Sequence, residues 1–426
     1  MALTIFKQKD IRKHVLFVAL VLVILRFGAQ LPIPMLDVST VKTWLAGGMH
    51  NGFSLLNLFT GGALENMSVF ALSVTPYITA SIILELLCVG FPALARFKKS
   101  DAESGGYKMT MITKLTTVGI AVISAVGLML MLFRNGLLTL TFYTGLLAVV
   151  AMVAGTMFLV WLGDELSDNG IGNGVSMVLM LNILSKLPSD IYSIYAKFMV
   201  GSPWWHSVLA VVISLTLFVG MVAMVILMEG SARVIPVNYA NHSGRGRHGK
   251  NVSNFSLKVN IAGVMPVIFA STVLGVPLMI ANFIKKPSEW LQAFSQNSWF
   301  RPEAIWYTVG YLLYAVLVVF FAYFYVSISF DTKEISRNMQ RNGGMIPGVR
   351  PGKPTTDYLN GLLRPLIWVG ALWLLLIATV PMIVNGISGL SLSFGGTSVI
   401  IIAGVVLEAM NELDSMLTTR KYPGIL

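Results

Sequence analysis

The side chains that could do acid–base or metal chemistry are few in the apolar runs of this sequence. Arg26, Glu85, Lys114 and Glu408 lie inside those runs, most of them near an end where a long side chain can reach water. All five histidines lie in loops or at the edges of the runs. We find no nucleophile, base or metal set within any run, so we expect no enzymatic activity, no cofactor and no metal.

One loop approaches a phosphate-binding motif. The stretch GRGRHGKN, residues 244–251, nearly fits the pattern G-x-x-x-x-G-K-[ST], but Asn251 replaces the hydroxyl that would hold magnesium. No predicted strand precedes it, so we interpret it as a flexible basic loop. Its Arg245 and Arg247 could contact an acidic partner or RNA phosphates, although cytoplasmic loops of membrane proteins also gather basic residues for reasons of topology.

A second loop presents an arginine on a turn. The stretch GGMIPGVRPGKPT, residues 343–355, combines Gly and Pro turn signals with Arg350 at its tip. A rigid turn with an arginine at its tip indicates recognition of a partner more than topology.

The elements that must position these residues are apolar helices. The chain is 55% hydrophobic and 12% charged with a mean hydropathy of +0.76, whereas soluble domains average about 45–50% apolar and 25% charged residues. A bilayer core requires about 20 apolar residues per helix. Ten segments qualify, near residues 15–33, 67–90, 111–133, 142–162, 171–187, 207–228, 260–284, 305–330, 362–384 and 395–412. The sequence therefore predicts an all-α polytopic membrane protein with ten transmembrane helices.

The basic residues predict the orientation of these spans, because Lys and Arg concentrate in cytoplasmic loops. If the N-terminus is cytoplasmic, most of the 30 Lys and Arg residues fall on that face. The same face takes the loops 229–259 and 331–361 and both termini. Removing the fifth or sixth span would move the first of these loops to the opposite face. The net charge of +11 follows from this topology and does not by itself imply nucleic acid.

Two of the apolar runs carry the same proline motif. Residues 74–81 read VTPYITAS and residues 264–271 read VMPVIFAS, which keeps Val, Pro, Ile, Ala and Ser in place. We expect Pro76 and Pro266 in the centres of two helices, where each proline frees a backbone carbonyl and permits a bend at the membrane midplane. Chance agreement between two apolar helices is the alternative explanation.

The motif divides the chain into two halves of five spans, residues 1–195 and 196–426, and falls in the second span of each. Because five is odd, the second half enters the membrane in the opposite direction, so the halves form an inverted repeat. The fifth and tenth spans both open with glycines, at 170–176 and 394–399. Inverted repeats place their functional site at the midplane between the halves, where we expect a central pore.

The centre predicted in this way is aliphatic. The proline motifs and the glycine-led spans contribute Val74, Ile78, Val175, Leu179, Ile268 and Ile401. A ring of such side chains can close a pore by excluding water. Ordinary helix packing is the simpler explanation for any one of them alone. A secondary transporter is the main alternative to a channel, but it would need a polar or ionisable substrate site at broken helices.

A short apolar segment interrupts the pattern between the first two spans. Residues 52–68 are too short to cross a membrane and are broken by Gly61 and Gly62. One interpretation is an interfacial helix that lies on the lipid surface. The other is a re-entrant half-helix, which is tolerated only where protein or a water-filled cavity surrounds it and which could close a cavity.

Seven motifs together extend over nearly all 426 residues. They are LPIP (31–34), NLFTGGAL (57–64), FALSVTPYITASII (70–83), GTMFLVWLGDELSDNGIGNGVS (155–176), KVNIAGVMPVIFAS (258–271), PGVRPGKPT (347–355) and FGGTS (394–398). In these motifs and their order the chain resembles the SecY family, the central subunits of bacterial protein-translocation channels. The resemblance implies a passive channel in the plasma membrane that carries unfolded preproteins across and releases hydrophobic helices sideways into the lipid bilayer.

The resemblance also implies roles for particular residues. The six aliphatic residues named above match the pore ring of the family. The outer segment, within residues 53–66, matches the plug that seals the resting channel, here Asn57, Leu58, Phe59, Thr60, Gly61, Gly62, Ala63, Leu64, Glu65 and Asn66. We call residues 57–66 the plug segment.

Two further sites follow from the resemblance. The second and seventh spans, with the third and eighth, match the lateral gate where signal sequences insert, and Pro76, Asn260 and Pro266 are the gate residues that we expect. Arg245, Arg247 and Arg350 match cytoplasmic positions that contact the SecA ATPase or the ribosome. SecE and SecG are the small membrane subunits that such a channel would bind.

Overall fold

The computed structural model describes residues 9–34, 38–39, 41, 60–103, 106–134, 136, 142–198, 204–239, 252–282, 299–300, 308–388 and 396–421. Its helices are α2 (Lys9–Gln30), α5 (Thr75–Gly90), α6 (Pro92–Glu103), α7 (Tyr107–Arg134), α8 (Phe142–Asn169), α9 (Gly174–Leu184), α10 (Leu187–Phe198), α11 (Trp204–Gly230), α12 (Met265–Asn282), α13 (Val309–Ser329), α14 (Thr332–Arg341), α15 (Lys353–Ser388) and α16 (Gly396–Lys421). Its strands are β1 (Ala232–Tyr239), β2 (Val252–Lys258) and β3 (Gly344–Met345).

Each of the ten predicted spans coincides at least in part with one of these helices. Within the described residues, five helical stretches are long and apolar enough to cross a membrane, namely Arg12–Gln30, Tyr107–Arg134, Phe142–Asn169, Val309–Arg341 and Lys353–Val384. A sixth is added if α5 and the start of α6, which meet at a bend of 116°, form one span. The predominantly helical membrane fold is thus confirmed, whereas the count of ten spans remains a prediction.

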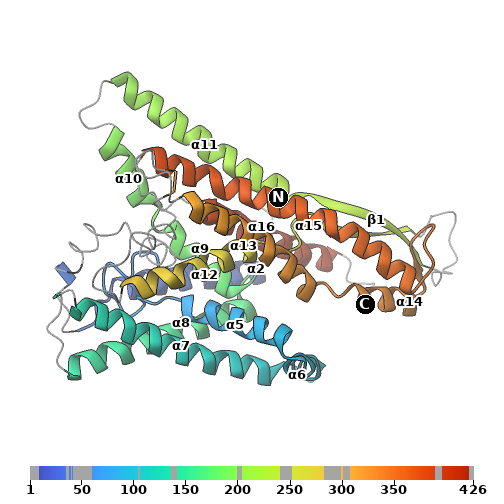
Figure 1. The fold of residues 1–426 in the computed structure, drawn as a ribbon, viewed down its shortest axis with the longest axis horizontal. Coiled ribbons are helices and arrows are strands. Elements are labelled where there is room, and N and C mark those ends of the chain that lie inside the picture. Colours follow the sequence, from blue (N-terminus) through green and yellow to red (C-terminus); the bar gives the residue numbers. More distant parts are fainter. Residues whose placement is uncertain are drawn as a thin grey trace.

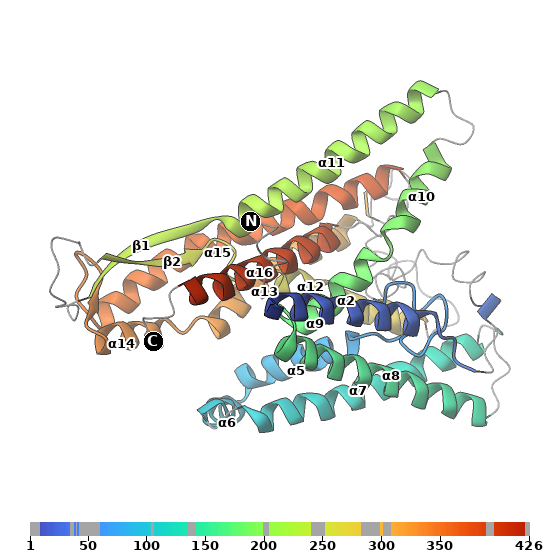
Figure 2. The ribbon, with the colours of Figure 1, turned by 180° about the vertical axis from the view of Figure 1, so that it is seen from behind.

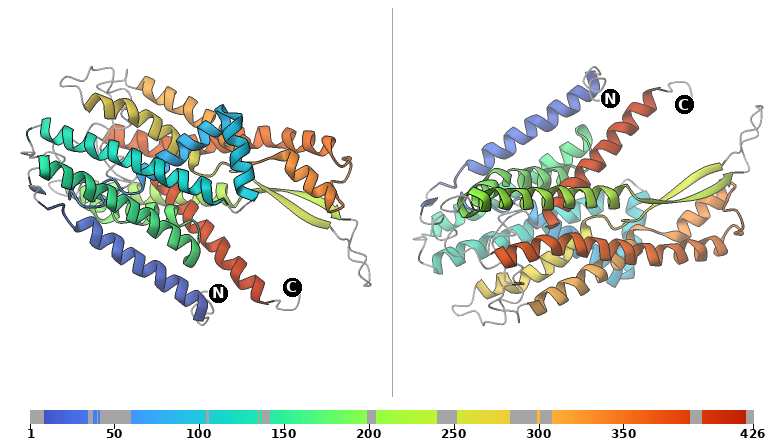
Figure 3. Two further views of the ribbon diagram at one scale, coloured as in Figure 1. Left: turned by 90° about the horizontal axis from the view of Figure 1, so that it is seen from below. Right: turned by 90° about the horizontal axis from the view of Figure 1, so that it is seen from above.

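The helices form two groups that lie side by side (Figure 1). The first group contains α5 to α8, with α2 packed along α8, and the second contains α11 to α16 (Figures 1 and 2). The short helix α9 packs against both α8 and α16, so it joins the two groups. Figure 3 shows that α2 begins and α16 ends towards the end of the molecule that carries the β1–β2 hairpin.

Apolar side chains fill each group and the region between them. The first group is held together by a core that includes Ala125, Met129 and Met152 from α7 and α8. The core of the second group includes Tyr314 and Val318 of α13 together with residues of α11, α12, α15 and α16. A third core lies between the groups and contains the candidate site described below.

A small sheet extends from the end of α11, and the all-α prediction misses it. Strands β1 and β2 pair antiparallel from Ala232↔Lys258 to Asn238↔Val252, and β3 adds to the far end of β1 to give the order β2-β1-β3. Ile235 and Val237 point to one side of β1, where they pack with residues of α14 and α15. The alternation at 233–239 signals a strand, but Pro236 argues against one. The proline is tolerated here because β3 leaves most of that edge of β1 unpaired.

The two prolines of the repeated motif do not lie in the centres of helices, so that prediction was wrong. Pro76 is the second residue of α5 and Pro266 is the second residue of α12. The first N–H groups of a helix have no partner within it, so proline, which lacks an N–H group, is favoured there. The motif therefore begins two helices and bends neither.

The backbone before each proline follows the same path in both copies of the motif. Ser73 and Gly263, each three residues before its proline, adopt left-handed conformations with φ of 52° and 60°. The next carbonyl, of Val74 or Val264, then accepts a hydrogen bond from the N–H group four residues later, at 3.1 and 3.3 Å. The sequence repeat thus encodes a repeated turn that starts a helix.

Candidate functional site

The six predicted ring residues lie together in one apolar cluster, which we call the ring cluster. The buried members among them are Val74, Leu179, Ile268 and Ile401, with exposed fractions between 0 and 7%, and Ile78 and Val175 pack against these. The ring cluster also contains residues of α2, α8 and the plug segment. Residues that are separated by more than 300 positions in the sequence therefore meet at one place between the two helix groups.

Four different elements position these side chains. Val74 precedes α5, and Ile78 lies in its first turn. Val175 and Leu179 are four residues apart on α9, so they share one face of that helix. The second helix group supplies Ile268 from α12 and Ile401 from α16. The ring cluster is thus assembled from both halves of the chain.

Helix α9 can reach the ring cluster because glycines let it approach α8. A Cβ atom on Gly174 would lie only 1.9 Å from the carbonyl oxygen of Gly163, so a side chain there would separate the helices. Asn173 caps the start of α9, where its side chain accepts a hydrogen bond from the Ser176 N–H group at 3.2 Å. The glycine-led start that the sequence shows therefore serves close packing.

The six ring residues are all aliphatic, so their side chains offer a substrate no charge and no hydrogen bond. Such a lining excludes water when its side chains are in contact. When they part, it can let side chains of any kind pass, because it has no group that binds one of them selectively. A constriction of this kind suits a conduit better than it suits the polar substrate site of a transporter.

The described part of the plug segment, residues 60–66, is buried against the ring cluster. Thr60 to Leu64 are buried, and Ala63 is a member of the cluster. These residues form turns, so the expected half-helix is absent from residues 60–66, and their burial argues against a helix that lies on lipid. The chain turns sharply at Gly61 and Gly62, whose φ values are 63° and 87°. Asn57, Leu58 and Phe59 lie outside the described residues.

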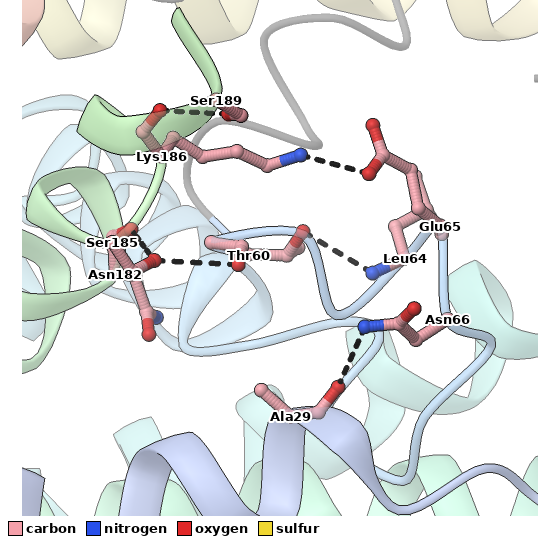
Figure 4. Close-up of polar contacts among 10 residues, drawn as sticks. Ala29, Thr60, Leu64, Glu65, Asn66, Asn182, Ser185, Lys186 and Ser189 are labelled. Carbon is pink, nitrogen blue, oxygen red and sulfur yellow. Dashed lines mark hydrogen bonds and ion pairs between the residues drawn. The ribbon is translucent and has the colours of Figure 1, made fainter. Parts of the chain in front are cut away.

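Polar side chains at the end of α9 hold the plug segment from one side (Figure 4). Lys186 Nζ pairs with Glu65 Oε2 at 2.9 Å, and Ser185 Oγ donates to the carbonyl oxygen of Gly61 at 3.3 Å. On the opposite side, Asn66 Nδ2 donates to the carbonyl oxygen of Ala29 in α2 at 3.4 Å. The sequence analysis did not identify Ser185 or Lys186. Their signal was polar residues at the end of an otherwise apolar helix.

The starts of α5 and α12, which carry the motif prolines, lie where the two helix groups meet. Ile82 of α5 is buried in the core of the second group, beside residues of α12. Ile78, Val264 and Met265 pack against both this core and the ring cluster. The side chains at the start of α5 and α12 therefore form a continuous apolar seam between the groups. Both motif prolines are buried.

Asn260 is the polar member of the predicted gate. It is buried just before α12, with an exposed fraction of 3%, and its Nδ2 donates to Glu229 Oε2 at the end of α11 at 3.1 Å. Asn260 thus connects the segment before α12 to the end of α11. One of its buried polar atoms, Oδ1, has no hydrogen-bond partner among the described residues.

The predicted docking arginines have different outcomes. Arg350 is exposed on a turn between β3 and α15, and glycines with φ of 84° and 99° flank it at positions 348 and 352. Its carbonyl oxygen accepts a hydrogen bond from Thr355 Oγ1 at 2.9 Å, which fixes the turn. Arg245 and Arg247 lie outside the described residues.

One intramembrane charge finds a partner that the sequence analysis did not anticipate. Helix α8 runs to Asn169, beyond the predicted end of its span, and so includes Asp164. Asp164 Oδ2 pairs with Lys114 Nζ of α7 at 2.6 Å. A paired charge between two packed helices has a structural explanation and does not require a proton relay.

A family model described as SecY matches residues 68–410, which include the six ring residues, the gate residues and Arg350. The protein translocase subunit SecY of Streptomyces scabiei is 38% identical to this chain over 437 aligned residues, which cover 99% of this chain and 98% of the relative. The chain belongs to the SecY family. The corresponding subunit of Aquifex aeolicus is 32% identical and covers 98% of this chain and 97% of the relative.

Solved structures share the fold. A protein-conducting channel superposes with a TM-score of 0.64 at 16% identity and covers 96% of this chain and 93% of its own. The canine Sec61 channel, in a complex with the ribosome, gives a TM-score of 0.61 at 16% identity, with coverage of 96% and 93%. A structure described as showing that the SecY plug domain stabilises the closed state of the translocation channel gives 0.64 at 17% identity, with coverage of 97% and 94%. These likenesses agree with the family assignment.

Proposed function

We propose that this chain is the channel subunit of a protein translocase, which carries unfolded preproteins across the membrane and passes hydrophobic helices sideways into the lipid. The observation that carries the proposal is the ring cluster, because six aliphatic residues from both halves of the chain meet in one place. The names and full-length identity of the SecY relatives support the same function.

The ring residues would form the constriction of the pore. At rest, their contact would exclude water and ions, and the plug segment packed against them would complete the seal. A preprotein would displace the plug segment and part the ring, whose apolar lining would slide over its side chains. The driving force would come from a partner.

The seam between α5 and α12 would be the lateral gate. It is apolar and lies where the two helix groups meet, so its parting would open the pore towards lipid. The gate would include Pro76, Asn260 and Pro266. A signal sequence or a hydrophobic helix could then replace the contacts between the helix groups with contacts of its own.

The partners follow from the same assignment. The channel would bind SecE and SecG within the membrane, and the SecA ATPase or the ribosome would dock on the cytoplasmic turn that carries Arg350, together with Arg245 and Arg247. Ribosome-bound relatives of the same fold support a ribosome contact. The bacterial sources of the relatives support a plasma-membrane location, with both termini in the cytoplasm.

The experiment that tests the channel is ion conductance after the ring is made polar. Ile78→Ser and Ile268→Ser should each raise the resting conductance of reconstituted vesicles, because a hydroxyl and a smaller side chain hydrate the constriction. Ile83→Ser is the matched control, since Ile83 lies on α5 and is exposed. Ring variants that conduct no more than Ile83→Ser would contradict the proposal.

A further inference from the structure

Three polar side chains at the end of α9 contact either the plug segment or Ser73, which follows the segment in the chain. Asn182 lies in the last turn of α9, Ser185 is the C-cap residue of that helix, and Lys186 follows it. Their partners are Ser73, the carbonyl oxygen of Gly61, and Glu65, at 3.0, 3.3 and 2.9 Å. Two of these contacts join the end of α9 to the plug segment, and the third joins it to Ser73, just before the start of α5.

These residues are polar where the surroundings are not. Asn182 and Lys186 have exposed fractions of only 4 and 9%, and the neighbouring Leu181 and Ile183 belong to the ring cluster. Burying an amide or an ammonium group is unfavourable unless a partner satisfies it. The plug segment supplies that partner to Lys186, and Ser73, the residue before Val74, supplies one to Asn182.

The backbone of the plug segment fits this helix end closely. A Cβ atom on Gly61 would lie 2.8 Å from the carbonyl oxygen of Asn182 and 2.9 Å from Ser185 Oγ. A Cβ atom on Gly62 would lie 3.0 Å from Lys186 Cε. The two glycines therefore let the segment lie directly against these polar residues at the end of α9.

We propose that Asn182, Ser185 and Lys186 form a latch that positions the plug segment in the resting channel, with the Lys186–Glu65 ion pair as its main contact. The inference rests on the proposed channel function and adds positioning residues to it. Displacement of the plug segment requires this pair to break, so the latch sets the fraction of channels that are unplugged at rest.

The decisive test of the ion pair replaces Lys186 and Glu65 one at a time and then exchanges the two residues. Lys186→Met and Glu65→Gln should each raise the resting ion conductance, and roughly a tenfold rise is the size expected for the loss of one charge-assisted hydrogen bond. The exchanged pair, Lys186→Glu with Glu65→Lys, should return the conductance towards that of the parent. Lys186→Arg, which keeps the charge, should stay near the parent.

A second measurement reports the exposure of the plug segment directly and does not depend on ion conductance. In a Cys88→Ser background, Leu64→Cys places a thiol at a buried position of the segment. A water-soluble maleimide should label this thiol several-fold faster in Lys186→Met than in the parent. Lys333→Met, at an exposed lysine of α14, is the control for the loss of a positive charge.

Two results would overturn the latch. One is labelling and conductance of Lys186→Met and Glu65→Gln equal to those of the parent while Ile78→Ser conducts, in which case the channel function stands without the latch. The other is an equal rise in the single variants and the exchanged pair, which would mean that packing and not the ion pair holds the segment. Failure of the ring variants to conduct would instead count against the channel, and the labelling rates would still decide the latch.

Discussion

At the scale of single residues, the absence of a side chain matters as much as its presence. Gly61 combines a left-handed φ of 63° with contacts that leave no room for a Cβ atom. Arg26 contributes to this crowding, because its Nη2 would lie 2.9 Å from that atom. The position of the plug segment therefore depends on Gly61, a residue that has no side chain.

Gly61→Ala should loosen the plug segment and raise the resting ion conductance. The left-handed backbone alone costs a residue with a Cβ atom about 1–2 kcal/mol, and the three short contacts add to this. Gly106→Ala separates the two effects, since Gly106 has a similar φ of 71° but open space around it. Equal conductance in the two variants would show that the close contacts do not matter.

The residues of the candidate site differ in how well the sequence predicts them. The ring residues could be found because the proline motif and the glycine-led spans each occur twice. Asn182, Ser185 and Lys186 could not, because their partners lie more than a hundred residues away and a polar residue at a helix end is unremarkable by itself. Long-range partners of this kind require the fold.

At the scale of elements, the two halves repeat a way of starting a helix. α5 and α12 each follow a left-handed residue, begin one residue before a proline and place an isoleucine of the ring in the first turn. The first-turn preference of proline could have predicted these starts from the sequence. The small sheet could not be foreseen as readily, because Pro236 obscures β1.

Gly263 allows the repeated turn to be tested. Its counterpart in the first half is Ser73, and nothing lies within 4 Å of the position that a Cβ atom on Gly263 would take. Gly263→Ser should therefore lower the free energy of unfolding by no more than about 1–2 kcal/mol. Gly263→Val should lower it further, because a β-branched residue is strongly disfavoured at positive φ.

Thermal unfolding of the purified protein measures both changes. Gly275→Val is the control for added bulk, since Gly275 lies within α12 at a negative φ and also has open space. If Gly263→Val unfolds at the same temperature as Gly263→Ser, the turn does not need its left-handed conformation.

At the scale of the whole molecule, the candidate pore and the candidate docking turn are separate. The ring cluster lies between the helix groups, whereas Arg350 lies on the turn between β3 and α15, which packs beside β1 and α14. Figure 1 shows β1 and α14 at one end of the molecule. The sequence predicts this separation correctly through its hydropathy and its basic loops. The break between α5 and α6 is signalled by Gly90 and Pro92, but the angle of 116° between the two helices cannot be read from the sequence.

Arg350→Glu should reduce the translocation of a secreted precursor at least tenfold, roughly the loss expected for one charge-assisted contact that is turned into a repulsion. The variant should still insert into the membrane, because Arg350 is exposed on a turn and belongs to no apolar core among the described residues. Lys333→Glu makes the same change of charge on α14 and should translocate normally. Undiminished transport by Arg350→Glu would remove this residue from the docking surface.

The apolar seam at the start of α5 and α12 has a consequence for cooperativity. Ile78, Val264 and Met265 contact both the ring cluster and the core of the second helix group, so they couple the packing of the two cores. In the proposed channel, dilating the constriction and parting the two groups would then be coupled through these three side chains. A substrate that enters the bilayer sideways and a substrate that crosses it would start from the same activated state.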